Sequence, residues 1–236
     1  MTRAPGRLAQ AISAFEKTLR APNLRRAQLS FGAAWASGWA VTVAVGILAY
    51  NHGGAAAVGI VGLVRMLPAA LLAPVAAVVV DRHRRERVLV GVGLARGAAL
   101  GGAALSVWLL ASPLPAYALV ALDTVALTLY RPAHSALLPS ICTTATELTS
   151  SNVVRALLDS LGALLGPLLA AVLVGPIGID GVFAACAAAA LWSAWLIARV
   201  DYEAPPRLAQ TVQTPRLCAK RSRASRPLLA GVRCGC

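Results

Sequence analysis

Acidic residues and lysines are scarce in this chain of 236 residues. Only nine residues are Asp or Glu, and charged residues of all kinds make up 13% of the sequence. Lysine contributes just two of the 22 basic residues, Lys17 and Lys220, and such a preference for arginine is typical of a GC-rich bacterial genome. Hydrophobic residues make up 58%, and the mean hydropathy is +0.70. This composition excludes a soluble globular domain and predicts a membrane protein.

Motifs for several kinds of chemistry are also missing. No Gly-x-x-x-x-Gly-Lys segment is present, so ATP is not expected to be the energy source. No His, Asp, Ser or metal-ligand cluster converges in the sequence, so we predict no enzyme activity, no metal and no cofactor. The odd number of cysteines and their spacing argue against a disulfide framework, although Cys234-x-Cys236 could bind a soft metal. The five cysteines are Cys142, Cys186, Cys218, Cys234 and Cys236.

The formal net charge of +13 could indicate a nucleic-acid-binding protein. The arginines, however, cluster in segments that the hydropathy pattern places on one side of a membrane. Basic residues on one side of a polytopic protein follow the bias of Lys and Arg toward the cytoplasm. The expected partner is therefore the lipid bilayer and not a nucleic acid.

The chain is organised around two apolar runs that flank the charged segment 81–87. Residues 55–80 carry a single charge, Arg65, and residues 88–111 also carry one, Arg96. Each run exceeds the roughly 20 residues that a helix needs to cross a bilayer. We therefore predict two membrane-spanning helices joined by a loop whose arginines keep it in the cytoplasm. Asp81 would cap the C-terminal end of the second helix, where its carboxylate would face an arginine or the N-terminus of another helix. The alternative is that Asp81 is a solvated loop acid.

The same pattern extends over the chain and predicts an all-α polytopic protein with six transmembrane helices. The three outer turns, near 51–54, 112–115 and 175–181, contain no Lys or Arg, whereas the segment before the first helix is basic, so both termini are expected in the cytoplasm. In the fourth helix, Arg131-Pro132 could end the helix, but continuation to about Leu138 gives it enough length to span. The predicted spans are about 27–50, 55–80, 88–111, 116–138, 152–174 and 182–198, with a polar inner loop at 143–152.

Three regions follow from this reading. Residues 1–24 form an amphipathic interfacial segment, or an organellar transit peptide as the alternative, because their apolar residues fall at helical spacing. Residues 25–200 form the six-helix domain. Residues 201–236 form a basic, disordered cytoplasmic tail.

Charged residues within the predicted spans are the functional candidates. A charge near the bilayer centre costs about 2.5–3.5 kcal/mol or more, so these residues should face the bundle interior, pair with each other or line a water-filled cavity. Arg155 and Asp159 lie one helical turn apart. The alternatives to a functional role are neutralisation of Asp123 by Arg65 and extension of Arg131 and Arg155 to the interface. The candidates are Arg65, Arg96, Asp123, Arg131, Arg155 and Asp159.

Several segments resemble the major facilitator superfamily. Asp81-Arg82-x-x-Arg85, followed by Leu89, resembles the signature between its second and third helices. Arg131 is similarly placed to an arginine of its fourth helix, and Gly162-x-x-x-Gly166-Pro167 resembles the helix-packing motif of its drug-exporting antiporters. The segments 65–68, 131–139 and 148–152 resemble exporters of the siderophore and macrolide type.

The resemblance implies a secondary active exporter whose two six-helix halves rock around a central cavity, driven by a proton or ion gradient. The substrate is an unidentified small molecule, and the membrane is the bacterial inner membrane. Only the N-terminal half is apparent, so a second six-helix half or a homodimer mate is the expected partner, and the Gly162/Gly166 face should lie uncovered without it. The alternative is a truncated or non-transporting membrane protein that acts through lipid or partner contacts.

Overall fold

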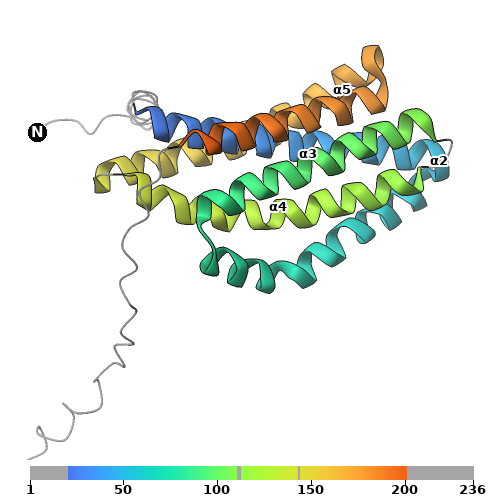
Figure 1. Cartoon of the computed structure of the whole chain (residues 1–236). Coiled ribbons are helices and arrows are strands. Elements are labelled where there is room, and N and C mark those ends of the chain that lie inside the picture. Colours follow the sequence, from blue (N-terminus) through green and yellow to red (C-terminus); the bar gives the residue numbers. More distant parts are fainter. Residues whose placement is uncertain (1–20, 111–112, 143, 201–236) are drawn as a thin grey trace, which may run out of the picture. The chain divides into compact units, whose positions relative to one another are not determined.

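The computed structural model describes residues 21–110, 113–142 and 144–200, except for the side chains of residues 77, 79 and 81. Within these ranges all the regular secondary structure is helical (Figure 1). The predicted tail, most of the predicted interfacial segment and the side chain of Asp81 lie outside the described part. The helices are α2 (Pro22–Arg82), α3 (Arg85–Leu109), α4 (Leu114–Ile141) and α5 (Ala145–Ala198).

Two of these helices bend sharply at glycines and are each composed of two rods. In α2 the break lies at Gly53 and Gly54, and Gly54 has φ 65° and ψ −157°, a conformation that residues with a Cβ rarely adopt. In α5 only Gly178 departs from helical geometry, with φ 73°. We call the rods α2N (22–52), α2C (55–82), α5N (145–177) and α5C (179–198). The predicted turn at 175–181 is therefore wrong in extent, because all its residues except Gly178 are helical.

The two inner loops are also shorter than predicted. Helix α2 continues through Arg82, its C-cap is His83 and not Asp81, and α3 begins two residues later at Arg85. Arginine is a good helix former, and Glu86 in the first turn of α3 suits the helix dipole, so the charged segment extends both helices. The predicted loop at 143–152 is largely the first turns of α5.

The start of α5 has a clear local cause. Thr144 is the N-cap, and its side chain accepts a hydrogen bond of 3.2 Å from the backbone N–H of Glu147. Thr-x-x-Glu is the pattern of a capping box, which satisfies free N–H groups at a helix start. In contrast, the prediction that α4 continues past Pro132 is confirmed, because α4 reaches Ile141.

The core consists of two apolar clusters at different levels of the bundle, to which all four helices contribute. One uses residues 40–49 of α2N and 100–104 of α3, and the other uses 27–34 of α2N and 89–92 of α3. The polar residues Ser37 and Arg96 fall between these stretches. The core therefore has a polar layer between two apolar ones.

Close backbone contact joins α3 to α5C. A Cβ on Gly93 would lie 2.7 Å from the Cβ of Ala194, and Gly97 faces Leu191, whereas Gly101 has nothing within 4 Å. Small residues at a spacing of four allow helices to approach closely in a membrane. The contact therefore uses Gly93 and Gly97, which lie four residues apart, and not Gly101.

Among the described helices, three are long and apolar enough to cross a membrane: α2 over Pro22–Ala76, α3, and α5. Large apolar side chains are exposed on α2C and α5N; Leu71 and Leu164 are 70% and 66% exposed. An exposed apolar surface of this kind is expected against lipid or another membrane helix. Helix α4 is 28 residues long, which is about 42 Å, but it carries Asp123, Arg131 and His134.

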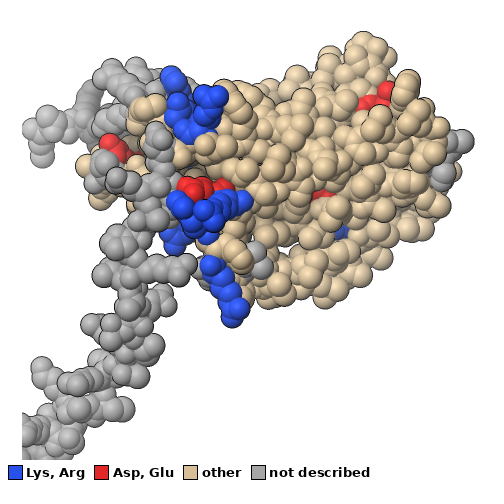
Figure 2. All heavy atoms as spheres, viewed as in Figure 1, with Lys and Arg blue, Asp and Glu red and all other residues tan. Residues whose placement is uncertain are grey.

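Basic side chains gather at one end of the bundle (Figure 2). This end contains the start of α2, the connection from α2 to α3 and the end of α5 (Figure 1). The opposite end contains the bends of α2 and α5 and the connection from α3 to α4. The two bends, residues 51–54 and 175–181, contain no Lys or Arg. We call the first the basic end.

Candidate functional site

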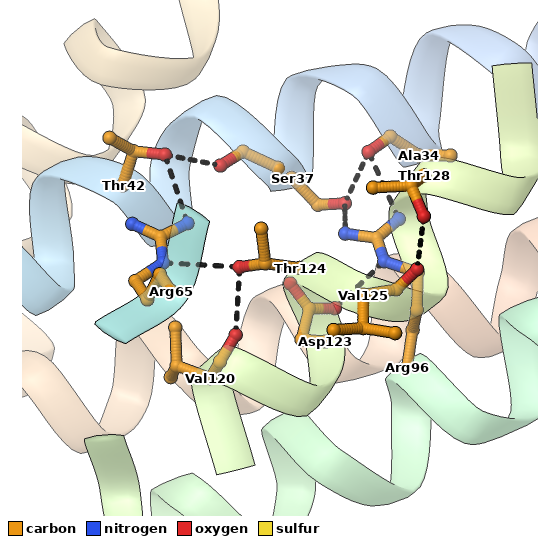
Figure 3. Close-up of polar contacts among 11 residues, drawn as sticks. Ala34, Ser37, Thr42, Arg65, Arg96, Val120, Asp123, Thr124, Val125 and Thr128 are labelled. Atoms are coloured by element: carbon orange, nitrogen blue, oxygen red, sulfur yellow. Dashed lines mark hydrogen bonds and ion pairs between the residues drawn. The ribbon is translucent and has the colours of Figure 1, made fainter. Parts of the chain in front are cut away.

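A buried ion pair occupies the polar layer near the middle of α3 and α4 (Figure 3). Arg96 Nε donates to Asp123 Oδ1 at 2.8 Å, and each side chain is 1% exposed. The other guanidinium nitrogens of Arg96 bind α2N, where Nη1 donates to the carbonyl of Ala34 at 3.1 Å and Nη2 to Ser37 Oγ at 3.3 Å. One positive and one negative charge thus connect three helices. We call Arg96 and Asp123 the central pair.

Arg65 lies beside the central pair but is bound by hydroxyls. Its Nε donates to Thr124 Oγ1 at 3.1 Å, its Nη2 donates to Thr42 Oγ1 at 3.4 Å, and the residue is 7% exposed. Asp123 attracts Arg65 electrostatically without bonding it. The predicted Arg65–Asp123 neutralisation is therefore wrong as a direct contact, because the orientation of α3 brings Arg96 to the carboxylate.

A second group of charges lies between α4 and α5N. Arg131 Nη2 donates to Asp159 Oδ2 at 2.8 Å, and these side chains are 51% and 31% exposed. Arg155 Nη1 donates to Ser135 Oγ at 2.6 Å, and Ser135 Oγ donates to the carbonyl of Arg131 at 2.8 Å. Arg155 and Asp159, one turn apart on α5N, do not form an ion pair with each other, since Asp159 pairs across to α4. We call Arg131, Ser135, Arg155 and Asp159 the rim cluster.

Aromatic rings of α2N support both arginines of the rim cluster. The guanidinium carbon of Arg131 lies 5.0 Å from the centre of the Trp35 ring, and that of Arg155 lies 5.5 Å from the Phe31 ring. The two rings stack on each other with centroids 5.6 Å apart. Cation–π contacts of this kind attract a guanidinium and hold its plane. Sequence reasoning missed both aromatics, although their spacing of four residues on a helix places them on one face.

A third polar group lies fully buried nearer the basic end. Ser30 Oγ, Tyr130 Oη and Ser193 Oγ share hydrogen bonds of 2.5, 2.8 and 3.2 Å and tie α2N, α4 and α5C together. His134 Nε2 lies 3.1 Å from the carbonyl of Ala27, while its Nδ1 is buried without a hydrogen-bond partner. The sequence analysis assigned these residues no role. The hydrogen bonds among the three hydroxyls indicate a structural clamp between the helices.

The loop candidates lie apart from these groups. Arg82 is exposed in the last turn of α2, and Arg85 is half-buried at the start of α3. Among the described side chains, no hydrogen bond or ion pair joins either arginine to the central pair or to the rim cluster. Asp81 belongs to the same last turn of α2, and its side chain lies outside the described atoms.

The glycines of α5N pack against α2N. A Cβ on Gly166 would lie 2.5 Å from the carbonyl oxygen of Ala36 and 2.7 Å from the Cβ of Trp39, and one on Gly162 would lie 3.3 Å from the Ala36 nitrogen. Both glycines are buried, and Pro167 beside them is half-buried. The expectation that this face would lie uncovered is wrong, because α2N of the same chain covers it.

A small apolar cavity of about 190 Å³ lies next to this contact, between α2N and the two rods of α5. Its lining includes Ser37, which binds Arg96, and Cys186. The described residues contain no group of three or more His, Cys, Asp or Glu side chains that could hold a metal ion.

Comparison with known proteins places the chain in a family. The family model of the Major Facilitator Superfamily matches residues 29–235. No curated protein and no solved structure matches the chain. The match covers most of the sequence, including all of α3, α4 and α5. The chain therefore belongs to the Major Facilitator Superfamily, whose members are membrane transporters and not enzymes.

Proposed function

We propose that the chain forms six transmembrane helices, α2N, α2C, α3, α4, α5N and α5C, and works as one half of a secondary active exporter. It would lie in a bacterial inner membrane with its basic end in the cytoplasm, as the distribution of Lys and Arg favours. A second six-helix unit, either a separate half or another copy, would complete a small-molecule path by alternating access. The family match and the exposed apolar surfaces of α2C and α5N support this proposal.

The observation that carries the proposal is the central pair. Asp123 is a buried carboxylate with a single ion-pair partner, in a protein whose family moves solutes across membranes. Intramembrane carboxylates that pair with arginine are typical of proton and ion pathways. Asp123 is therefore proposed to bind the coupling proton.

The geometry suggests how such a proton would act on the fold. Arg96 bridges Asp123 on α4 to Ala34 and Ser37 on α2N. Protonation of Asp123 would remove the charge that holds Arg96 against α4 and leave Arg96 bound to α2N alone. Because an unpaired buried charge is costly, the helices would then favour an arrangement in which Arg96 reaches water or another carboxylate. Proton binding would thus shift the contact between α2N, α3 and α4.

Infrared difference spectra of the purified full chain in lipid would test this role without knowledge of the substrate. Acidification should produce a protonated-carboxyl band that Asp123→Asn removes and that the matched change Asp180→Asn, at the opposite end, leaves in place. Gradient-driven efflux from cells that express the full chain should also stop with Asp123→Asn. The double change Arg96→Gln/Asp123→Asn controls for misfolding, because it removes both charges together.

Efflux at the parental rate by a folded double variant would remove Asp123 from the mechanism. If the infrared band persists in Asp123→Asn, the proton binds elsewhere. If no energised export of any solute depends on the chain, the result would contradict the transporter proposal. It would favour the alternative, a non-transporting membrane protein that acts through lipid or partner contacts.

A further inference from the structure

We infer that the rim cluster recognises an oxyanion, a carboxylate or phosphate group, on an aromatic or apolar small molecule, with Arg155 as the principal contact. The inference rests on the proposed function, since it names the substrate class of the same transporter. It starts from three observations: the depth of the two arginines, their unbalanced charge and their rigid support.

Both arginines lie deep within their helices, away from the helix ends. Arg155 is ten residues from the first residue of α5, Ala145, and Arg131 is ten residues from the last residue of α4, Ile141. At about 1.5 Å per residue, each lies about 15 Å along its helix from the same end of the bundle.

The rim cluster is also partly open. The Arg131 side chain is 51% exposed and that of Asp159 is 31% exposed. Acyl chains cannot solvate such charges, so these exposed ionised groups must face water or a polar partner. The open side of the rim cluster is therefore accessible to a polar ligand.

The rim cluster also carries an uncompensated positive charge. Asp159 pairs with Arg131, while Arg155 is bound by the neutral hydroxyl of Ser135. Among the described residues, no second carboxylate lies within ion-pair distance of either guanidinium. His134, the other titratable group facing Arg155 from α4, is fully buried. Two cations and one anion leave a net charge of +1, which an anionic ligand would neutralise.

The support of the arginines favours binding over simple repulsion. Phe31 and Trp35 hold the two guanidiniums by cation–π contacts, so little side-chain freedom remains to be lost when a ligand arrives. A guanidinium has five N–H donors, and each of these two uses one in a side-chain hydrogen bond. A carboxylate or phosphate can accept two parallel hydrogen bonds from such a group. The half-buried ring of Trp35 suits an apolar or aromatic body on the same ligand.

Binding of matched probes to the full chain tests the inference. We would place the chain in phosphatidylcholine nanodiscs and measure the affinity of naphthalene-2-carboxylate and of the neutral analogue naphthalene-2-methanol. The carboxylate should bind about tenfold tighter or more, as expected for charge-assisted hydrogen bonds. Arg155→Gln should remove most of that difference and leave the alcohol unchanged, while Arg155→Lys should retain part of it.

Matched controls separate site-specific loss from a general effect of charge or misfolding. Arg25→Gln removes the same charge from an exposed position in the first turn of α2 and should change neither affinity. Ser135→Ala removes the hydroxyl that holds Arg155 and should weaken carboxylate binding by a smaller factor. It serves as the second variant if Arg155→Gln fails to fold.

Several results would overturn the inference. Equal affinities for carboxylate and alcohol would do so, as would equal losses in Arg25→Gln and Arg155→Gln. Competition by phosphatidylglycerol in the nanodisc, with no such effect of phosphatidylcholine, would assign the oxyanion site to a lipid headgroup and not to a substrate. Selective carboxylate binding without energised export would contradict the proposed function alone, whereas export that is insensitive to Arg155→Gln would contradict this inference alone.

Discussion

The central pair and the rim cluster are both built from arginine and aspartate, yet their surroundings differ in every respect that matters for function. The central pair is 1% exposed, has one charge of each sign and is bound on three helices. The rim cluster is up to 51% exposed and has two cations for one anion. Full burial with balanced charge favours a fixed contact that opens only when its charge changes, whereas partial exposure with surplus charge favours binding from solution.

The contrast predicts opposite responses when a carboxylate is removed. In the central pair, loss of the carboxylate strands a buried cation and should cost stability. In the rim cluster, the same loss leaves an arginine that water already reaches, and should change affinity instead. The following predictions exploit this difference.

The largest effect is expected for Asp123→Asn. Removing one partner of a buried ion pair costs about 3–5 kcal/mol, because Arg96 remains charged and unpaired. Thermal or denaturant unfolding in detergent should therefore show a large loss of stability. Arg96→Gln/Asp123→Asn should recover much of it, and a double variant as unstable as the single one would show that the pair does more than balance charge.

Gly166→Ala should have the next largest effect. The new Cβ would lie 2.5 Å from the Ala36 carbonyl oxygen, so α5N must move away from α2N, at about 1–3 kcal/mol for overpacking. This shift separates Arg155 from the Phe31 ring on α2N, so binding at the rim cluster should weaken.

Gly175→Ala is the matched control. Gly175 lies on the same rod, α5N, and a Cβ there would meet nothing within 4 Å. Equal stability of the two alanine variants would show that α2N and α5N are not held at this contact.

Asp159→Asn should have the smallest effect on stability, within about 1 kcal/mol, because a half-exposed ion pair contributes little. It raises the net charge of the rim cluster from +1 to +2, so naphthalene-2-carboxylate should bind a few-fold tighter. Titration of the probe against the variant and against Asp180→Asn measures this directly. Weaker binding in Asp159→Asn alone would mean that Asp159 orients Arg131 for the ligand.

Hydropathy and charge spacing were sufficient to predict the helical class, and the resemblance of short motifs indicated the family, because both kinds of signal are properties of single segments. The confirmed path of α4 through Pro132 followed from the length a span requires. The helix starts near Arg85 and Ala145 were missed although local signals were present: helix-forming arginines in one case and the Thr144–Glu147 capping box in the other.

The ion-pair partners could not be predicted in the same way. All six charged candidates were named from the sequence, but the choice of Arg96 over Arg65 for Asp123 depends on how α3 and α2C are rotated about their axes. The same holds for Asp159. It pairs with Arg131 on α4 and not with Arg155, which lies one turn away on α5N. The rotation of each helix about its axis is set by contacts with other helices, such as the packing of Gly93 against α5C. The sequence of one segment alone does not reveal such contacts.

Water-soluble thiol reagents of opposite charge test most directly whether the rim cluster is open to anions and the central pair is sealed. Single cysteines would replace Ser135 and Ser37 in a chain with its five native cysteines changed to serine. The reagents are the sulfonate and the trimethylammonium forms of ethyl methanethiosulfonate, with rates normalised to a free thiol. We predict that Ser135→Cys reacts several-fold faster with the sulfonate, and that Ser37→Cys, beside Arg96, reacts with neither. Equal normalised rates at position 135, or labelling at position 37 as fast as at 135, would contradict the account.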